Sequence, residues 1–263
     1  MEPYTPDELR RALVLDHYPR TSQYDPQWVI ENSMGPHVLW LTEALASTMR
    51  LEHGMRVLDL GCGKGISSIF LAREFAVEVW AVDLWIDATT NWHRIRGQAD
   101  ARIVPLQADA RALPFAHDFF DAIICVDAYH YFGTDDLALE SLSRFVRPGG
   151  EIGVIVPGTL EEFTGVPDDL RPYWHRDFST FHSPAWWLSH WSKSGLVDIV
   201  VCDAVPEGWK QWSLWCETKV RQGNDDDREQ AEMLRQASGR SLGFVRIVAS
   251  RLEEPAMTWS REA

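Results

Sequence analysis

Residues 56–65 of this chain read Arg-Val-Leu-Asp-Leu-Gly-Cys-Gly-Lys-Gly. A short apolar strand carries an acidic residue near its end and then meets glycines on alternate positions, at 61, 63 and 65. Glycine allows a sharp backbone turn and a close approach by a ligand. The helix predicted to follow presents its amino terminus, with its free N–H groups, to that ligand. The stretch therefore predicts an α/β protein that holds a nucleotide-like cofactor at the carboxyl end of its first strand.

The composition of the 263 residues narrows the class of protein. The formal net charge of −14 argues against a nucleic-acid partner, because phosphate binding needs a basic surface. The four cysteines are scattered without a CxxC pair, which predicts buried free thiols in a reducing cytoplasm. The polar start of the chain does not resemble a signal peptide, and no apolar run approaches the roughly 20 residues that span a bilayer. We expect a cytoplasmic protein with no stable membrane insertion.

Strands and helices are expected to alternate along the middle of the chain. That order is typical of a parallel, doubly wound sheet. The predicted strands are 56–60, 77–82, 102–107, 120–126 and 151–156. The predicted helices between them are 66–75, 86–96 and 135–146, the last one ended by Arg147-Pro148-Gly149-Gly150.

Three regions are predicted within one compact domain. Residues 1–50 are expected to form a helical amino-terminal cover, and residues 51–157 the cofactor-binding core. Residues 158–263 are expected to complete the sheet and to carry two substrate-side insertions, 158–183 and 206–240. Insertions of this length usually have a functional reason. The remaining predicted elements are helices at 7–15, 26–32, 36–49, 184–194 and 227–238, and strands at 196–202 and 241–251.

The spacing of the glycines limits the choice of cofactor. The nicotinamide dinucleotide fingerprint is G-x-G-x-x-G, whereas this chain has G-x-G-x-G with Ile66 at the position of the last glycine. Lys64 lacks both the spacing and the following hydroxyl residue of a phosphate-binding loop. A nicotinamide oxidoreductase is therefore a weak alternative.

Two acidic residues point to an adenosine-containing ligand. Asp83 ends the second predicted strand, where an acid reaches the ribose hydroxyls in sheets of this type. Asp109 follows the third predicted strand, where its carboxylate can accept a hydrogen bond from an adenine amino group. Because both follow a glycine loop at the ends of consecutive strands, they outline an adenosine site together.

Five motifs, in order, resemble the class I S-adenosylmethionine-dependent methyltransferases. Residues 57–65 resemble the first motif of that family, and Asp83 matches its ribose-binding acid. Asp109-Ala110, followed by Leu113-Pro114-Phe115, is similar to its adenine-binding segment. Residues 119–124 resemble its fourth strand and residues 147–150 its turn before the fifth strand. The resemblance covers about residues 50–157.

The resemblance implies a Rossmann-like, seven-stranded sheet whose last strand is antiparallel. It implies S-adenosylmethionine as the cofactor, with the glycine loop near the methionine part, and it implies no metal. Trp85 is placed to pack on the adenine, with core packing as the competing interpretation. The expected cofactor-binding residues are Asp59, Gly61, Cys62, Gly63, Gly65, Asp83, Leu84, Trp85, Asp109, Ala110 and Val126.

Catalysis is expected at the carboxyl end of the fourth strand, residues 126–132. Methyl transfer from a sulfonium mainly requires that the acceptor be aligned and that water be excluded. A base is needed only if the acceptor loses a proton. The candidate catalytic residues are Asp127, Tyr129 and His130. His130 has the pKa range of a general base, although a structural role for this residue competes.

Aromatic residues gather in the carboxyl half, where eight of the thirteen tryptophans lie at or after position 174. Such residues can wall a pocket for a planar acceptor or for an amine held by cation–π contact. Packing in the core is the competing explanation, and the stripe Trp209, Trp212 and Trp215 is also a candidate homodimer surface. The candidate substrate-binding residues are Tyr18, Trp174, His175 and Trp209.

The leading hypothesis is a methyltransferase that acts on oxygen, nitrogen or carbon of a small molecule. A lipid acceptor is compatible with the apolar insertions. The alternative is an S-adenosylmethionine-binding protein of the same fold with a regulatory or non-methylating role, since a fold does not fix a function.

Overall fold

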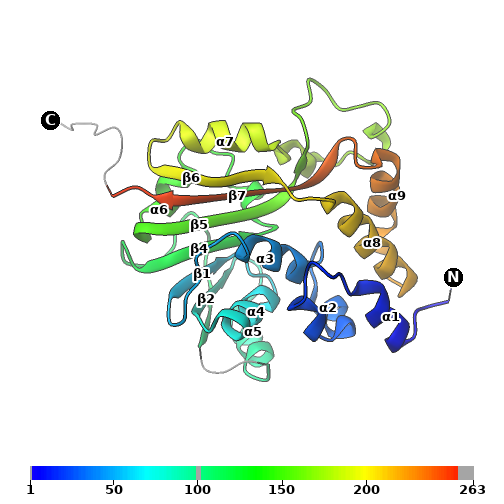
Figure 1. Cartoon of the computed structure of the whole chain (residues 1–263), viewed down its shortest axis with the longest axis horizontal. Helices are drawn as coiled ribbons and strands as arrows, with labels where there is room; N and C mark the ends of the chain where they lie inside the picture. Colours follow the sequence, from blue (N-terminus) through cyan, green and yellow to red (C-terminus); the bar gives the residue numbers. More distant parts are fainter. Residues whose placement is uncertain (1, 99–101, 254–263) are drawn as a thin grey trace.

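A single seven-stranded sheet runs through the computed structural model, which describes residues 2–98 and 102–253 (Figure 1). The strand order is β3-β2-β1-β4-β5-β7-β6. The strands are β1 (Arg56–Leu60), β2 (Glu78–Asp83), β3 (Ile103–Gln107), β4 (Phe120–Val126), β5 (Val146–Thr159), β6 (Val197–Ala204) and β7 (Leu242–Arg251). Strands β1 to β5 pair in parallel, while β7 lies antiparallel between β5 and β6. The predicted doubly wound sheet with an antiparallel last strand is confirmed.

One predicted turn belongs to a strand instead. Residues 147–150 were expected to form the turn before strand five, yet they lie inside β5. Val146 pairs with Phe120 and Glu151 pairs with Ala122, and the register shifts between these two pairs. Gly149 has φ = 72°, which suits the extra residues of a bulge. Pairing with β4 on both sides of the bulge keeps this segment in the sheet.

The helices form where capping side chains begin them. The helix predicted from Pro36 begins at Val38, because the His37 Nδ1 atom accepts a hydrogen bond from the Trp40 N–H (3.2 Å). Asp87 and Ser183 cap α5 and α7 in the same way. The α-helices are α1 (Pro6–Leu13), α2 (Pro26–Asn32), α3 (Val38–Ala46), α4 (Ile66–Phe75), α5 (Ala88–Ile95), α6 (Ala138–Ser143), α7 (Pro184–Ser192), α8 (Gly208–Arg221) and α9 (Arg228–Ala237).

Two apolar cores cover the two faces of the sheet. In β4, Ile124 faces the core that includes side chains of α3, α4, α8 and α9, while its neighbours Ile123 and Cys125 face the core that includes α6 and α7. A strand buried on both faces reads as a continuous apolar run, as this strand does. Trp212 and Trp215 of α8 are buried in the first core. This supports core packing as the reason for the tryptophan stripe and leaves the homodimer a prediction.

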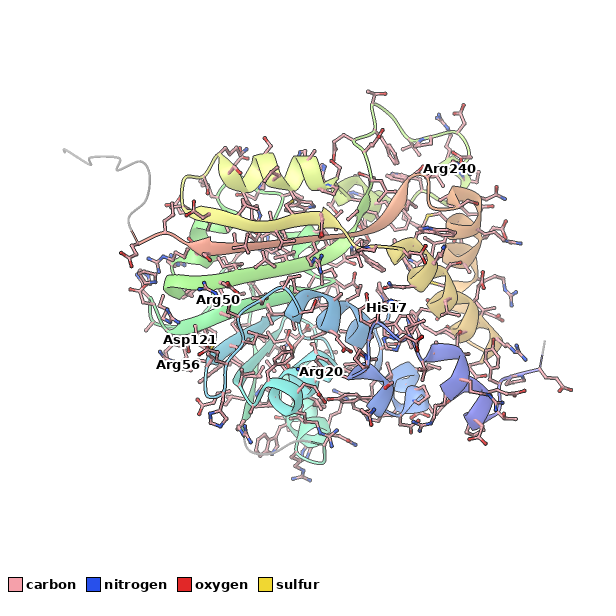
Figure 2. The ribbon with its side chains drawn as sticks, in the orientation of Figure 1. His17, Arg20, Arg50, Arg56, Asp121 and Arg240 are labelled. Carbon is pink, nitrogen blue, oxygen red and sulfur yellow. The ribbon has the colours of Figure 1, made fainter. Side chains whose placement is uncertain are left out.

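The two ends of the sheet differ in chemistry. At the end where β1 begins, Asp121 accepts hydrogen bonds from the Arg56 N–H (2.7 Å) and the Arg147 Nε–H (2.7 Å). Figure 2 shows Arg56 and Asp121 together at this end, with Arg50 close by. At the other end, α1, α2, α8 and α9 gather beyond the sheet (Figure 1). The charged cluster is thus structural, and the helical end is where a site can form.

The structure also bears on the cysteines and on the possibility of a membrane-spanning helix. All four cysteines are free thiols; Cys62, Cys125 and Cys216 are buried, as predicted, and Cys202 is half-buried. Within residues 2–98 and 102–253, no helix has both the length and the apolar character needed to cross a bilayer.

Candidate functional site

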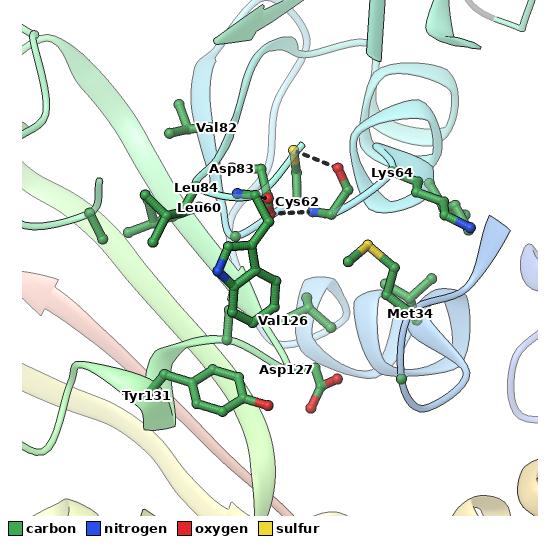
Figure 3. Close-up of a pocket in the computed structure, with 18 of the residues that line it drawn as sticks. Met34, Leu60, Cys62, Lys64, Val82, Asp83, Leu84, Val126, Asp127 and Tyr131 are labelled. Carbon is green, nitrogen blue, oxygen red and sulfur yellow. Dashed lines mark hydrogen bonds between the residues drawn. The ribbon is translucent and has the colours of Figure 1, made fainter. Parts of the chain in front are cut away.

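A cavity of about 200 Å³ opens at the carboxyl ends of β1, β2 and β4, where the sequence places the cofactor. Figure 3 shows its walls, which come from the glycine loop, the end of β2 and the segment after β4. Residues 32–36, between α2 and α3, close one side. Most of the expected cofactor-binding residues line this cavity: Gly61, Cys62, Gly63, Asp83, Leu84, Trp85, Asp109, Ala110 and Val126.

The glycine loop forms the floor of the cavity, and its first N–H groups are bonded within the protein. The N–H groups of Gly61 and Cys62 both donate to the Val82 carbonyl (2.8 and 3.0 Å). Gly61 has φ = 75°, and a Cβ there would lie 2.3 Å from the Cβ of Ala128. A Cβ at Gly63 would lie 2.9 Å from the Met34 sulfur. Any side chain at these positions would therefore fill space that the fold leaves for other groups.

Asp83 links the glycine loop to the turn after β2. One of its carboxylate oxygens accepts from the Gly63 N–H (2.8 Å), and the other from the N–H groups of Trp85 (2.8 Å) and Ile86 (3.0 Å). The Oδ2 atom carries one of these bonds, so it has a lone pair left for a hydroxyl group in the cavity. Asp83 is therefore able to organise the loop and to contact a ligand at the same time.

Two expected cofactor-binding residues lie behind the cavity wall. Asp59 is buried, and one of its oxygens accepts from the Ser67 (2.7 Å) and Ser68 (2.5 Å) hydroxyls at the start of α4. Its Oδ1 atom has no partner among the described residues, and burial raises the pKa of the carboxyl to about 6. Gly65 begins α4 with φ = 79°, against the side chain of Ile95. Both residues shape the loop rather than line the cavity.

The opposite wall carries one acid and one aromatic ring. The Asp109 carboxylate accepts from the Arg111 N–H (2.9 Å) and Nε–H (3.1 Å), and these bonds lower its pKa. Trp85 is 67% exposed, so it does not belong to the core. Its ring stands edge-on to that of Tyr131, with 6.1 Å between the centroids. An exposed indole on a cavity wall is available to pack against a flat ligand.

Asp127, expected to be catalytic, faces the cavity from the end of β4 (Figure 3). Its backbone is left-handed, with φ = 56°, a conformation that costs energy for a residue other than glycine. Burial raises the pKa of its carboxyl to about 7, and the positive charge of Lys219 acts in the opposite direction. A carboxylate with this pKa is suited to accept a proton near neutral pH.

The other two expected catalytic residues do not line the cavity. Tyr129 is buried beside Trp187 and Trp191 of α7, with ring centroids 5.6 and 5.7 Å away. His130 is buried against Phe181, and burial lowers its pKa to about 4. Both residues lie in the 3-10 turn Tyr129–Tyr131, which buries Tyr129 and His130 and leaves Tyr131 exposed.

Tyr131 was not among the predicted catalytic residues, yet it lines the cavity, whereas Tyr129 and His130 do not. Its side chain is 53% exposed, and its hydroxyl points toward Asp127 in Figure 3. Burial of part of the ring, together with the charge of Asp127, raises the pKa of its hydroxyl to about 12. Tyr131 is thus a neutral hydrogen-bonding group at neutral pH. One signal in the sequence was available: Tyr131 is the next residue after His130 in the segment that follows the fourth strand.

The segment 32–36 also lines the cavity, although the sequence predicted only a general cover formed by residues 1–50. The Gly35 carbonyl accepts from the Trp215 indole N–H (2.9 Å), and the Glu31 carbonyl from the Lys64 ammonium (3.1 Å). These bonds hold the end of α2 over the glycine loop. Met34 is half exposed and lines the cavity.

The candidate substrate-binding residues are scattered. Tyr18 is buried, and its hydroxyl donates to the Gln211 side-chain oxygen (3.1 Å). Trp174 packs beside Phe163 and Phe178, and Trp209 lies against Gly239. Of the four residues named as substrate-binding, only His175 lines a cavity, the second one described below.

The chain is similar to known proteins in sequence and in fold. Residues 57–150 match the model of a family described as a methyltransferase domain. The chain is 30% identical over 167 residues to Methyltransferase GfsG of Streptomyces halstedii. These matches support the resemblance of residues 57–150 to the class I S-adenosylmethionine-dependent methyltransferases. The resemblance drawn from the sequence motifs is confirmed.

Two further similarities concern a part of the sequence and the overall fold. The chain is 37% identical over 98 residues to a fatty-acid O-methyltransferase of Mycolicibacterium smegmatis, which is 37% of this chain and 35% of that protein. A Haemonchus contortus phosphoethanolamine N-methyltransferase 2, solved with S-adenosyl-L-methionine, superposes with a TM-score of 0.70 at 19% identity. That superposition covers 93% of this chain and 60% of the other. At this identity it supports the fold alone.

The matched part is a fraction of each curated relative. The match to GfsG covers 59% of this chain and 57% of that protein. The family model matches residues 57–150, which include the glycine loop, Asp83 and Asp127 of the cavity. The comparisons therefore show the fold and the type of domain, and the activity of the whole protein is a matter for proposal.

Proposed function

We propose that this protein transfers a methyl group from S-adenosylmethionine to a small-molecule acceptor, and that Asp127 accepts the proton that the acceptor loses. The observation that carries the proposal is the Asp127 carboxylate, with a pKa of about 7, in the wall of a cavity at the glycine loop. The match of residues 57–150 to a methyltransferase domain supports the type of reaction.

The cavity fits the proposed methyl donor by its chemistry. The Asp83 Oδ2 atom retains a lone pair for a ribose hydroxyl, and the Trp85 face is free for an adenine. The glycine floor has no side chain to obstruct a ligand. The expected donor-binding residues that line the cavity, from Gly61 to Val126, keep that role in the proposal. Asp59 and Gly65 are proposed to shape the loop.

The residues of this chain are proposed to do three things. Residues 32–36 and Trp85 exclude water from the reacting atoms, which favours displacement over hydrolysis. The Tyr131 hydroxyl orients the acceptor, and the Asp127 carboxylate takes its proton. When bound, S-adenosylmethionine would supply an electrophilic methyl carbon on a sulfonium and would leave as the neutral thioether S-adenosylhomocysteine. The Asp127 carboxylate would take the proton of the acceptor, so charge and atoms balance.

The acceptor class follows from the relatives and from charge. Relatives whose names print a substrate include a fatty-acid O-methyltransferase and a phosphoethanolamine N-methyltransferase, and both substrates are small molecules. The net charge of −14 disfavours nucleic acid. A base such as Asp127 favours an acceptor with a proton to lose, a hydroxyl or a protonated amine. Residues 1–50 as a cover, residues 51–157 as the donor-binding core, a cytoplasmic location and a homodimer remain predictions.

Calorimetry and a turnover assay test the proposal together. S-adenosylmethionine and S-adenosylhomocysteine are titrated into the protein, and release of S-adenosylhomocysteine is followed with hydroxylated fatty acids and hydroxyamines as acceptors. We expect binding of both cofactor forms and turnover with at least one acceptor class. Binding of a nicotinamide dinucleotide without S-adenosylmethionine binding would overturn the proposal. Tight cofactor binding without any turnover would favour the regulatory alternative.

A further inference from the structure

A second cavity, of about 360 Å³, lies on the far side of residues 33–35 from the donor cavity. The same three residues, Ser33, Met34 and Gly35, line both cavities, so only one thin segment separates them. The second cavity is enclosed by α8, α9 and the two 3-10 turns Arg171–Tyr173 and Arg176–Thr180. These elements belong to the two insertions, which the donor-binding fold does not need.

Its charged groups are mostly acidic. Lys219, a basic residue of the lining, is buried and bonded to the Asp227 carboxylate (2.9 Å), so its charge is neutralised within the wall. Glu229 faces His175 at 3.6 Å. The Asp226 carboxylate has no cationic partner among the described residues, although its own N–H donates to Asn224. Asp226 and Glu229 therefore leave the mouth of the cavity with excess negative charge.

Aromatic rings complete the wall. Tyr173 and Phe178 line the same cavity, and both are half-buried, so part of each ring is free. Carboxylates together with aromatic faces attract a positively charged ammonium group, through charge and through the ring quadrupole. The electrostatic contribution of Asp127, beyond the dividing segment, has the same sign. The lining carries polar groups but offers little for an anion, because its one ammonium is already paired.

We infer that this second cavity binds an ammonium group of the methyl acceptor, with the accepting atom in the neighbouring donor cavity. This inference rests on the proposed function and names the substrate class: a small molecule with both a cationic amine and an accepting atom. The ammonium is a recognition group here, and it does not take part in bond making. The cavity thus explains why the chain carries α8 and α9 beside the donor site.

The experiment uses choline as the probe, with its neutral isostere in which C(CH3)3 replaces N(CH3)3⁺ as the matched ligand. Binding of each to the full chain, loaded with S-adenosylhomocysteine, is measured by saturation-transfer NMR titration. We expect choline to bind at least tenfold more tightly than the isostere, and this preference to decline as salt is raised. Equal binding of the two ligands would overturn the inference.

Variants place the preference at this cavity. The double variant Asp226→Asn/Glu229→Gln is expected to weaken choline binding at least fivefold and to leave the isostere unchanged. Asp225→Asn is the matched control, because Asp225 adjoins Asp226, pairs with Arg228 and does not line the cavity. Its choline affinity should stay within twofold of the parent. Unchanged choline binding in the double variant would overturn the inference.

A separate measurement distinguishes failure of this inference from failure of the proposed function. Calorimetry of S-adenosylhomocysteine on the same samples reports the donor site alone. If the cofactor binds but choline shows no preference, the inference is wrong and the proposed function stands. If choline is preferred but the cofactor does not bind, the proposed function fails and the cavity is a cation site of another activity.

Discussion

The Asp127 carboxylate lies directly against the α-carbon of Gly35: a Cβ built at position 35 would be 2.3 Å from its Oδ2 atom. The two residues come from different parts of the chain, the segment after α2 and the end of β4. The absence of a side chain at position 35 thus gives the carboxylate its place. Gly35 is itself fixed by the bond from the Trp215 indole N–H (2.9 Å).

Gly35→Ala tests this relationship. The new methyl group must displace either the Asp127 carboxylate or the segment 33–35, and we expect turnover to decrease roughly 10- to 100-fold. Gly165→Ala is the control, because a Cβ at Gly165 meets no atom within 4 Å. Turnover is compared at saturating S-adenosylmethionine. An unaffected Gly35→Ala enzyme would show that the Asp127 position does not matter for the reaction.

Asp127→Asn tests the proposed proton acceptor. Asparagine tolerates the left-handed backbone of this position, so the change removes the base with little strain. Turnover of the parent should rise with pH and level off above about pH 7, where the carboxyl is ionised. The variant should lose about 10²- to 10⁴-fold and lose this pH dependence. His130→Gln, with its side chain outside the cavity, should keep the parent's pH profile.

The raised pKa of Asp127 also makes a prediction for stability. The folded-state pKa, about 7, lies above the unfolded value of about 3.9, so the folded protein binds more protons between these values. Stability contributed by this group therefore falls as pH rises from about 4 to about 7. Asp127→Asn should raise the melting temperature more at pH 8 than at pH 5. An equal change at both pH values would contradict the assigned pKa.

Asp83→Asn tests the ribose acceptor and the organisation of the glycine loop together. One carboxylate oxygen becomes a donor and faces backbone N–H groups, so at least one of the bonds to Gly63, Trp85 or Ile86 is lost. Hydrogen bonds to charged groups contribute about 1.5–3 kcal/mol, so donor affinity should fall about 10- to 100-fold in calorimetry. Asp87→Asn, which retains its capping role outside the cavity, is the control.

Trp85→Ala tests the adenine wall. Loss of stacking on a base typically costs about 1–3 kcal/mol, so S-adenosylhomocysteine affinity should fall about 5- to 100-fold. Trp92→Ala is the matched control, because Trp92 is an exposed tryptophan that does not line the cavity. Quenching of indole fluorescence on cofactor binding should disappear in the first variant and persist in the second. Retained quenching with unchanged affinity would remove Trp85 from the site.

The sequence predicted most of the residues that line the first cavity, because the signals for them are local. Glycines at alternate positions, an acid at the end of the next strand and Asp109 after the third are read from short stretches in order. In a parallel sheet the carboxyl ends of neighbouring strands meet at one edge, so these stretches converge whatever the loops do. Ile66–Phe75 and Phe120–Val126 even have the predicted bounds.

The acceptor side could not be predicted in the same way because it depends on which side of a short turn faces the cavity. Asp127, Tyr129, His130 and Tyr131 are adjacent in sequence, and all carry suitable chemistry. Packing of Tyr129 against α7 and of His130 against Phe181 turns these two inward and leaves Asp127 and Tyr131 at the cavity. Those partners lie about fifty or more residues away, so no local pattern reveals them.

The sequence by itself predicted the sheet, the resemblance to a methyltransferase family and most of the residues of the expected donor site that line the first cavity, since alternating apolar strands and glycine turns are short-range signals. Tertiary structure alone decided where Asp127 points, that Gly35 makes room for it and that a second cavity lies beside them. These features arise where α2, α8, α9 and the end of β4 meet. Contacts between segments nearly 200 residues apart are set by packing, which no stretch of sequence records locally.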